Sequence, residues 1–497
     1  MRRFAVLLAL LALCLAGCGS GHDDKSVTPL DDALGYFPKD GPFVAAVETD
    51  PDGDQVKQIA ALVGRFPGVD VLAARVRNLT QIPLVRWGRD VRPQLGAPLV
   101  IGLSRPATGK GIPRAVIVAM RVNHSVRVKQ VLLRQPGFRG DGKSSGIRIY
   151  ENTSLHRYVA VDGDVVVGGT DRATLGQALA TRQSDNRMRE SAFNRDLAKL
   201  PTGGLVRVSA DPKALIGADP RRRPLLTVKW LGSLRRLGAV LKAAPTGISL
   251  DFRAATDSGA ITDGDLPLAP KSGPLPLIGR RGEVELGVRE PSRLARFAFQ
   301  AAHAIAPKRM ALLRALEPSG IDLEQQLPHH LKDYAVLGYD PLSHAFAARA
   351  DLNESGDVKS ALSTLTPVLP AVGALFGVKG LGVATPEAGE SFYALAKPKG
   401  GTAVFGVVGN TLVIANQAPR AAGLASESTH MAPHGATGSA VVTVNARELA
   451  GKLLAKQLSG PAALIAPLAV ASLRDLTGAI AINRDGLRGH FKLTIVK

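Results

Sequence analysis

The run Tyr158-Val-Ala-Val-Asp-Gly-Asp-Val-Val-Val167 decides the class of fold. Aromatic and β-branched residues flank Asp162-Gly163, a dipeptide that accepts the positive φ of a tight hairpin turn. The run therefore predicts two antiparallel strands. The stretch from Val404 to Ile414 repeats the pattern around Gly409-Asn410.

Helical patterns follow both hairpins, at Asp171 to Thr181 and at Ala418 to Ala425. Hairpins with appended helices predict an α+β fold, a mainly antiparallel sheet with helices packed on it. At three further joins an acid precedes a proline, and we interpret the acid as a helix N-cap and the proline as the first helical residue. These joins are Asp50-Pro51, Asp211-Pro212 and Glu290-Pro291.

The two hairpins belong to a longer internal sequence repeat. Five segments of the first half have counterparts in the second half, in the same order: 42–50 with 282–290, 113–123 with 343–353, 164–170 with 410–416, 204–211 with 439–446, and 246–253 with 477–484. Preserved order predicts a duplicated unit and two sequence-related lobes. We expect the first, basic repeat at 30–265, a Gly/Pro-rich linker at 266–279 and the second repeat at 280–497.

The N-terminus predicts export and a lipid anchor. Arg2-Arg3 precedes an apolar run from Phe4 to Leu13, the pattern of a signal peptide over residues 1–17. The sequence Leu15-Ala16-Gly17-Cys18 resembles the lipobox of bacterial lipoproteins, which implies lipidation of Cys18. The alternative is an ordinary secretory signal. Residues 18–29 are polar and small, so we expect a flexible tether to the extracytoplasmic face of the cell membrane.

The cysteine count agrees with this interpretation, because the only two cysteines are Cys14 and Cys18. Removal of the signal and acylation leave the mature fold with no disulfide and no thiol ligand for a metal. No other stretch has 18 consecutive apolar residues, so we predict no further membrane span.

The segment from Phe37 to Asp54, continuing to Arg65-Phe-Pro-Gly68, resembles the opening of an uncharacterised family. The family is catalogued as domain of unknown function 3352, and its members include secreted bacterial lipoproteins and membrane-anchored proteins. The resemblance implies no activity.

Four patterns that resemble catalytic or metal sites have simpler explanations. Residues 137–144 match the spacing of a P-loop and residues 142–146 that of a nucleophile elbow, but the strand and helix that both motifs need are not predicted around them. We interpret them as a Gly-rich connecting loop. The acids at 50–54 lack the Gly and Glu positions of an EF-hand. The histidine pairs 329–330 and 430/434 do not predict a zinc site, since the first would point its rings apart and the second lies in a loop pattern. We predict no cofactor and no metal.

The chain carries a formal charge of +20, and most of the excess lies in one third of it. Residues 65–229 hold 29 basic and 12 acidic residues, a net of +17. Such a field attracts anions, namely lipid headgroups, wall polymers or nucleic acid. Aromatic residues are only 4% and no nucleic-acid-binding motif is present, which argues against a specific nucleic-acid partner. An Arg-rich compositional bias is the alternative.

The stretch from Pro224 to Lys242 predicts an amphipathic helix, with Trp230, Leu234, Leu237 and Leu241 on one face. We interpret this helix as core-packing, with membrane contact as the alternative. The arginines in and before it are candidates for binding an anion: Arg221, Arg222, Arg223, Arg235 and Arg236.

Together these features predict a non-enzymatic, lipid-anchored envelope protein that contacts anionic membrane or cell-wall polymer. The alternative is a carrier, in which the sheets enclose an apolar cavity for a lipid or another hydrophobic ligand. A hydrolase is a distant third.

Overall fold

The computed structural model describes residues 28–66, 92–106, 115–135, 137–279, 283–314, 322–368, 370, 385–386, 392–396, 402–426, 429–432, 436–457 and 470–496. The signal peptide, Cys18 and most of the tether lie outside these residues, as do His434 and residues 67–91. The chain divides into two compact units. Unit 1 comprises Met1–Arg223, Arg235–Ala255 and Ile495–Lys497, and unit 2 comprises Pro224–Leu234 and Thr256–Thr494.

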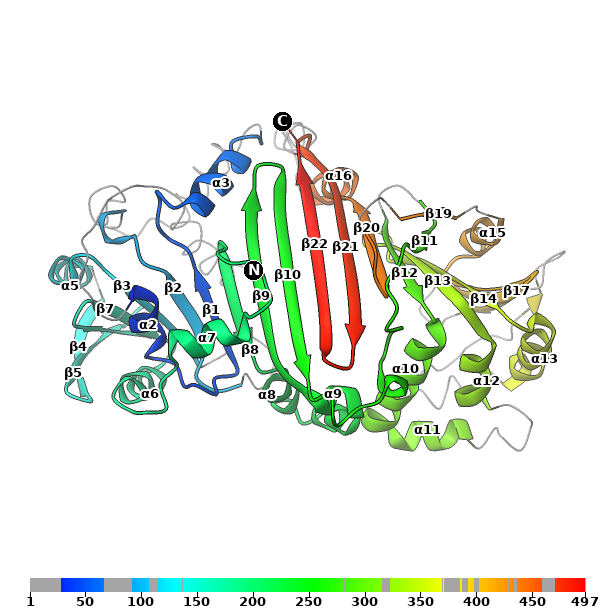
Figure 1. Ribbon diagram of the computed structural model, residues 1–497, viewed down its shortest axis with the longest axis horizontal. Coiled ribbons are helices and arrows are strands. Elements are labelled where there is room, and N and C mark those ends of the chain that lie inside the picture. The colour runs from blue at the N-terminus through cyan, green and yellow to red at the C-terminus, as the bar shows by residue number, and fades with distance from the viewer. Residues whose placement is uncertain are drawn as a thin grey trace. The chain divides into compact units, whose positions relative to one another are not determined.

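Unit 1 contains an antiparallel sheet with helices packed against it (Figure 1). Successive hydrogen-bonded neighbours give the order β9-β8-β1-β2-β3-β7-β6-β5-β4. The strands are β1 Phe43–Val47, β2 Leu99–Leu103, β3 Val116–Arg121, β4 Phe138–Ser144, β5 Ile147–Asn152, β6 Arg157–Asp162, β7 Val165–Gly169, β8 Val206–Ala210 and β9 Leu234–Ala244, and β10 Gly247–Thr256 pairs with β9. The helices are α2 Pro29–Leu34, α3 Asp54–Val63, α5 Ser125–Arg134, α6 Arg172–Arg182, α7 Glu190–Asp196 and α8 Pro212–Gly217, with the 3-10 turn η2 Arg92–Gln94.

The core of unit 1 lies where α2, α6 and α7 cover this sheet. It includes Phe37, Ile117, Leu175 and Phe193, all without measurable exposure. The α+β class with a large antiparallel sheet is therefore confirmed.

Unit 2 has its own antiparallel sheet, whose neighbours follow the order β21-β20-β12-β13-β14-β18-β17-β16-β15. The strands are β12 Val284–Arg289, β13 Leu331–Asp340, β14 Ala345–Leu352, β15 Thr385–Pro386, β16 Phe392–Ala396, β17 Thr402–Val408, β18 Thr411–Ala415, β20 Ala440–Asn445, β21 Leu473–Asn483 and β22 Gly486–Ile495. A separate small pair joins β11 Pro276–Leu277 to β19 His430–Met431. The helical segments are η3 Arg223–Thr227, α9 Lys229–Ser233, η4 Asp263–Asp265, α10 Pro291–Ile305, α11 Pro307–Arg314, α12 Leu323–His330, α13 Ser355–Leu365, η6 Thr366–Val368, α15 Ala418–Ser426 and α16 Ala446–Gln457.

Both predicted hairpins are present, with one turn shifted by a residue. Asp162 belongs to the strand and pairs with Val165, so the first turn is Gly163-Asp164 and not Asp162-Gly163, whereas Val408 pairs with Thr411 across Gly409-Asn410 as predicted. Gly163 and Gly409 have φ of 58° and 56°, the left-handed region that such turns need. The helices that follow them, α6 and α15, are also where the sequence predicted them.

The predicted amphipathic helix at 224–242 is wrong beyond Ser233. Residues 234–244 form strand β9 instead, paired with β8. The pairing with β8 determines this conformation, and Gly238 permits a close approach to the end of α7, because a Cβ at that position would lie 2.3 Å from the Asp196 carbonyl oxygen. The strand is held in a close backbone approach, which the spacing of its leucines does not encode.

Three smaller predictions also need correction. Residues 138–144 form strand β4 and not a connecting loop. Among the acid–proline joins, Asp211 and Glu290 occupy N-cap positions and a proline begins the helix, as predicted, but only Asp211 makes a capping bond, by accepting from the Ala214 N–H at 3.0 Å. Asp50 instead accepts from Asp52 in a turn before α3, and Glu290 makes no capping bond.

The run predicted as a linker, 266–279, belongs to unit 2 by its contacts, and it contains β11. Leu266, Leu275 and Leu277 in this run are buried. The contact-based division between the units falls after Ala255.

None of the helices within the described residues is both long and apolar enough to cross a bilayer.

Candidate anion-binding surface

Strands β4 and β5 form a hairpin at the outer end of the unit 1 sheet (Figure 1). Ser145 and Gly146, with φ of 50° and 81°, close it in a tight turn. The pairing shifts by one register between Gly140 and Lys143, which marks a β-bulge. After the bulge Lys143 stands directly opposite Arg148, and both side chains are exposed. Like charges opposite each other destabilise a sheet, so this pair favours an anion beside it.

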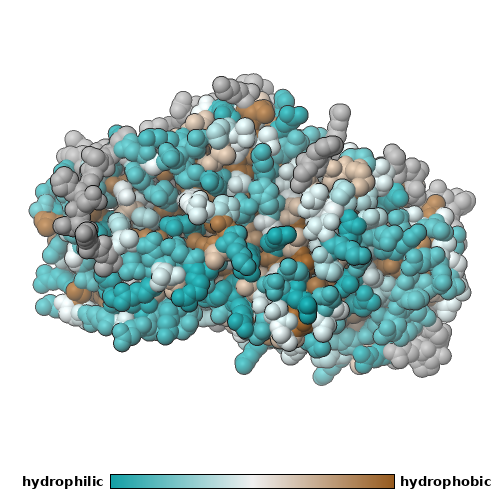
Figure 2. All heavy atoms as spheres, viewed as in Figure 1, coloured by the Kyte–Doolittle hydropathy of each residue, from teal (hydrophilic) through white to brown (hydrophobic). Residues whose placement is uncertain are grey.

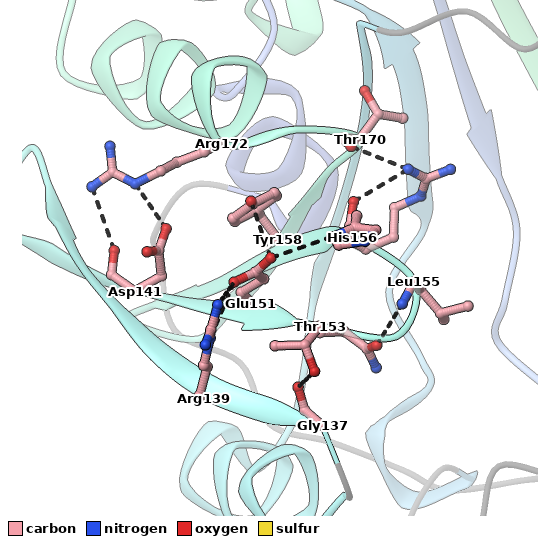
Figure 3. A network of polar contacts seen from close by, with 12 residues as sticks. Gly137, Arg139, Asp141, Glu151, Thr153, Leu155, His156, Tyr158, Thr170 and Arg172 are labelled. Atoms are coloured by element: carbon pink, nitrogen blue, oxygen red, sulfur yellow. Dashed lines mark hydrogen bonds and ion pairs between the residues drawn. The ribbon is translucent and has the colours of Figure 1, made fainter.

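One acid of the hairpin, Glu151, is already neutralised (Figure 3). Its side chain is only 9% exposed, and Arg139 donates to its Oε2 from Nη2 at 3.0 Å and from Nε at 3.3 Å. Tyr158 donates to Oε1 at 3.3 Å, and His156 Nδ1 lies 3.6 Å from the same oxygen. The hydrogen bond from Arg139 is the main cause that lowers the pKa of Glu151. The carboxylate therefore stays ionised, and its charge is balanced by Arg139.

The other acid, Asp141, is paired as well. Its Oδ2 accepts from Arg172 Nε at 2.8 Å, and its backbone carbonyl accepts from Arg172 Nη2 at 3.4 Å (Figure 3). Arg172 is the first residue of α6, so this ion pair ties the helix to the outer strand. Neither acid of the hairpin is left to neutralise Lys143 or Arg148.

Five cations remain around the hairpin, and we call them the basic rim. They are Lys129 and Arg134 on α5, Lys143 and Arg148 on the hairpin, and Arg157 at the start of β6. All five are exposed. Within the described part of the chain none has an acidic partner, and Arg157 donates only to the backbone carbonyls of His156 and Thr170.

Helix α5 adds apolar side chains to the same end of unit 1. It buries no residue completely, it lies against β4, and Val128, Val131 and Leu132 are its half-buried aliphatic residues. Its outward side carries Val126 and Leu133, 70% and 47% exposed. Seven residues make about two turns, so these two lie on one face. Lys129 flanks that face on one side, and Arg127 and Arg134 flank it on the other.

Leu155 extends this apolar set. It is 64% exposed in the turn between β5 and β6, and the Thr153 N–H donates to the Gly137 carbonyl at 2.8 Å, which holds that turn beside the start of β4. Figure 2 shows this end of unit 1 as mainly hydrophilic with isolated hydrophobic side chains. Cations around exposed aliphatic groups are typical of a surface that binds anionic lipid.

The structure places the five predicted anion-binding arginines differently. Arg221, Arg222 and Arg223 are exposed after α8, where Arg222 Nε lies 3.5 Å from Asp219 Oδ2. Arg235 is exposed on β9. Arg236 serves the fold, since it pairs with Asp196 at 2.9 Å and donates to Ser209 Oγ and the Gly41 carbonyl. The five do not share one element.

The basic rim was not predicted from the sequence. The usable signal was the run Ser125-Val-Arg-Val-Lys-Gln-Val-Leu-Leu-Arg134, whose outward positions mix aliphatic and basic residues. The opposition of Lys143 and Arg148 depends on the bulge and the turn, and no spacing rule reveals it.

A cavity of about 230 Å³ in unit 2 bears on the carrier alternative. It lies at the ends of β13, β14 and β18 and is lined by polar groups that include Lys332, Asp333, Asp351 and Asn410. This lining suits a polar ligand and not a lipid chain.

No family model matches the chain, and no curated protein matches it by sequence. Among solved structures it is similar to TP0453. Crystal form III of that protein gives a TM-score of 0.27 at 12% identity, over 48% of this chain and 84% of that chain. Form IV gives 0.26 at 11% identity, over 46% and 81%, and form I gives 0.25 at 12% identity, over 46% and 79%. At such TM-scores the likeness defines neither a shared fold nor a function.

Proposed function

We propose that this chain is a lipid-anchored, extracytoplasmic envelope protein whose first unit binds anionic lipid headgroups through the basic rim. It acts as a binding or scaffold module and not as an enzyme. Acylated Cys18 would hold the chain at the membrane, as expected for the bacterial lipoproteins and the domain-of-unknown-function 3352 family that its N-terminal part resembles. The observation that carries the proposal is the opposed pair Lys143 and Arg148, which has no acidic partner among the described residues, in the part of unit 1 where α5 and the β5–β6 turn also expose aliphatic side chains.

Membrane is favoured over cell-wall polymer by the apolar part of this surface. Each Lys or Arg near an anionic bilayer contributes about 1 kcal/mol, and that contribution is screened by salt. A wall polymer would be attracted by the same cations, but a hydrophilic polymer gains little from contact with the aliphatic side chains of Val126, Leu133 and Leu155. A bilayer accepts cations at the headgroups and aliphatic groups just beneath them.

We further propose that the two units arose by duplication. Their sheets have the same strand order, with β9-β8-β1-β2-β3-β7-β6-β5-β4 in unit 1 corresponding to β21-β20-β12-β13-β14-β18-β17-β16-β15 in unit 2. Four of the five matched sequence segments fall on corresponding strands of this order. The match of 246–253 with 477–484 is wrong in register, because the first segment lies on β10 and the second on β21, whose counterpart is β9.

The duplicated hairpins differ in charge, which supports a specialised first unit. The counterpart of β4–β5 is β15–β16, within Thr385-Pro-Glu-Ala-Gly-Glu-Ser-Phe-Tyr-Ala-Leu-Ala396. That stretch holds two glutamates and no basic residue, whereas residues 138–152 hold Arg139, Lys143 and Arg148. The cations are a property of one copy and are not required by the shared strand order.

The test is binding of residues 19–497, which lack the lipid, to vesicles with and without anionic lipid. Reversing Lys143 and Arg148 to Glu should weaken binding to anionic vesicles at least 10-fold. Reversing Arg221 and Arg222 to Glu changes the net charge equally and is the matched control, with a much smaller expected effect. Binding of the unaltered chain should fall steeply with salt.

Three results would count against the proposal. Equal losses in both variants would mean that diffuse charge, and hence composition, drives binding. Binding to an anionic wall polymer but not to vesicles would identify the polymer as the partner. Binding to neutral vesicles that is indifferent to salt would favour the carrier.

A further inference from the structure

A second cluster of polar side chains lies in unit 2, at the junction of two helices. His330 is the last residue of α12, Glu354 occupies the N-cap position of α13, and Asp357 follows in the first turn of α13. One potential ligand atom from each residue lies within 4.8 Å of the other two. The cluster is separate from the basic rim and plays no part in the proposed membrane contact.

His330 is the buried member of the cluster. It is only 8% exposed, and its Nδ1 has no hydrogen-bond partner. The nearest charged atom is Glu354 Oε2, at 3.8 Å. The rings of His329 and His330 meet edge to face with centroids 5.3 Å apart, so the prediction that they point apart is wrong. Buried polar atoms are nearly always satisfied, and this ring nitrogen is unsatisfied although it lies near the Glu354 carboxylate.

The carboxylates are not used by the helix. Glu354 holds the N-cap position but accepts no hydrogen bond from the first turn, and the hydroxyl of Ser355 donates to Asn410 instead. Residues three apart lie on the same side of a helix, so Glu354 and Asp357 place two negative charges together. Their combined charge exceeds the roughly +0.5 of a helix N-terminus, and the site is therefore attractive to a cation.

We propose that His330, Glu354 and Asp357 bind a divalent transition-metal ion of the zinc class. A neutral imidazole nitrogen with two carboxylate oxygens is a donor set for zinc and its neighbours, whereas calcium and magnesium prefer oxygen alone. Tetrahedral ligands about 2.1 Å from zinc are about 3.4 Å apart, so the cluster needs only a small contraction. The Glu354 side chain, 63% exposed, has room to turn inward.

Three protein ligands leave a fourth position for water or another small donor. The bound ion would join the end of α12 to the start of α13, two helices that are already in contact. We therefore expect the bound ion to hold these two helices of unit 2 together.

The experiment is titration of the unacylated chain, residues 19–497, with Zn²⁺ by calorimetry and with Co²⁺ by visible absorption. The unaltered protein should bind one ion per chain and show the d–d bands of a low-coordinate cobalt site. Asp357→Asn and Glu354→Gln, both at exposed positions, should each weaken binding at least 10-fold. His329→Gln, at the exposed neighbouring histidine, is the matched control and should retain the affinity.

Binding that survives in Asp357→Asn and Glu354→Gln would overturn the assignment, and so would the lack of any 1:1 binding of either ion. His330→Ala should abolish binding, but it alters a buried residue, so circular dichroism must show that the variant is folded. If His330→Ala is not folded, Asp357→Asn and Glu354→Gln still test the assignment. Because vesicle binding is measured separately, failure of the metal site leaves the membrane proposal standing.

Discussion

The hydroxyl of Tyr36 donates a hydrogen bond of 2.9 Å to Asp162 Oδ2. Asp162 ends β6, so this bond fastens the hairpin β6–β7 to the segment that follows α2. Tyr36 is almost completely buried, and the Arg182 guanidinium lies 5.5 Å from the centre of its ring. Arg182 in turn pairs with Asp32 at 2.9 Å, which closes a polar network at the edge of the core of unit 1.

Replacing Tyr36 with Phe should reduce the free energy of unfolding of unit 1 by about 2 kcal/mol at pH 7, because the Asp162 carboxylate loses its donor. Burial raises the pKa of Tyr36 well above its ordinary value of 10.0, and the charge of Asp162 raises it further. A tyrosine whose pKa is raised on folding stabilises below the unfolded pKa and loses that contribution as the pH rises above it. The difference between the two proteins should therefore shrink above about pH 10. Urea unfolding at pH 7, 9 and 10.5 measures it, and a constant difference would contradict the assignment.

In unit 2, Arg420→Met should destabilise by about 3 kcal/mol, because it removes the guanidinium that pairs with the buried Glu283 carboxylate. The two side chains are 10% and 11% exposed and in direct contact. The double variant with Glu283→Leu should recover most of the loss, since both buried charges of the pair are then replaced together. Chemical unfolding of the single and double variants tests this. A double variant no more stable than Arg420→Met would show that the loss of stability does not come from breaking the ion pair.

The assignment of residues 234–244 as a strand gives a test with opposite signs for the two interpretations. On an exposed helix surface Gly238→Ala would stabilise. In β9 the new methyl group meets the Asp196 carbonyl, so we expect a loss of about 2 kcal/mol. Gly140→Ala in β4, where a Cβ has open space within 4 Å, is the control and should change stability little. Thermal unfolding compares the two variants.

The contribution of the exposed aliphatic side chains to the proposed membrane binding can be separated from that of the charges. Replacing Val126 and Leu133 with Ser should weaken binding to anionic vesicles about 30-fold, since partial burial of each side chain contributes about 1 kcal/mol. The loss should be similar at low and high salt, unlike that of the charge reversals. Leu215→Ser, at a 37% exposed leucine of α8, is the control. A loss that disappears at high salt would mean that these aliphatic groups do not enter the bilayer.

Anchoring rests on Cys18. Cys18→Ser should prevent acylation and leave unprocessed or released protein in the expressing cell. Fractionation and mass determination of the N-terminus measure this outcome. Firm membrane retention with normal processing of the variant would rule out the lipobox.

The sequence predicted best what is determined locally. Gly163 and Gly409 supply the backbone conformation that their turns need, so both hairpins could be located from a few residues. The strand at 234–244 was missed because its leucines have helical spacing, while its conformation follows from pairing with β8, about thirty residues away. The proposed metal site could not be predicted for the same reason, since His330 and Glu354 come together through the pairing of β13 with β14. The glycines of residues 138–144 suggested a loop. In the structure they belong to a strand that is interrupted by a β-bulge.

The bulge between Gly140 and Lys143 has a further consequence for a protein held on a surface. Among the described residues β4 pairs on one side only, so its other side offers backbone groups to any passing strand. A lipid anchor confines neighbouring copies to two dimensions and raises their encounter frequency. The shifted register and the charges of Arg139 and Lys143 interrupt the ladder that a second copy would need. In the lipid-anchored protein that we propose, the same few residues would keep crowded molecules from joining edge to edge into oligomers or fibres.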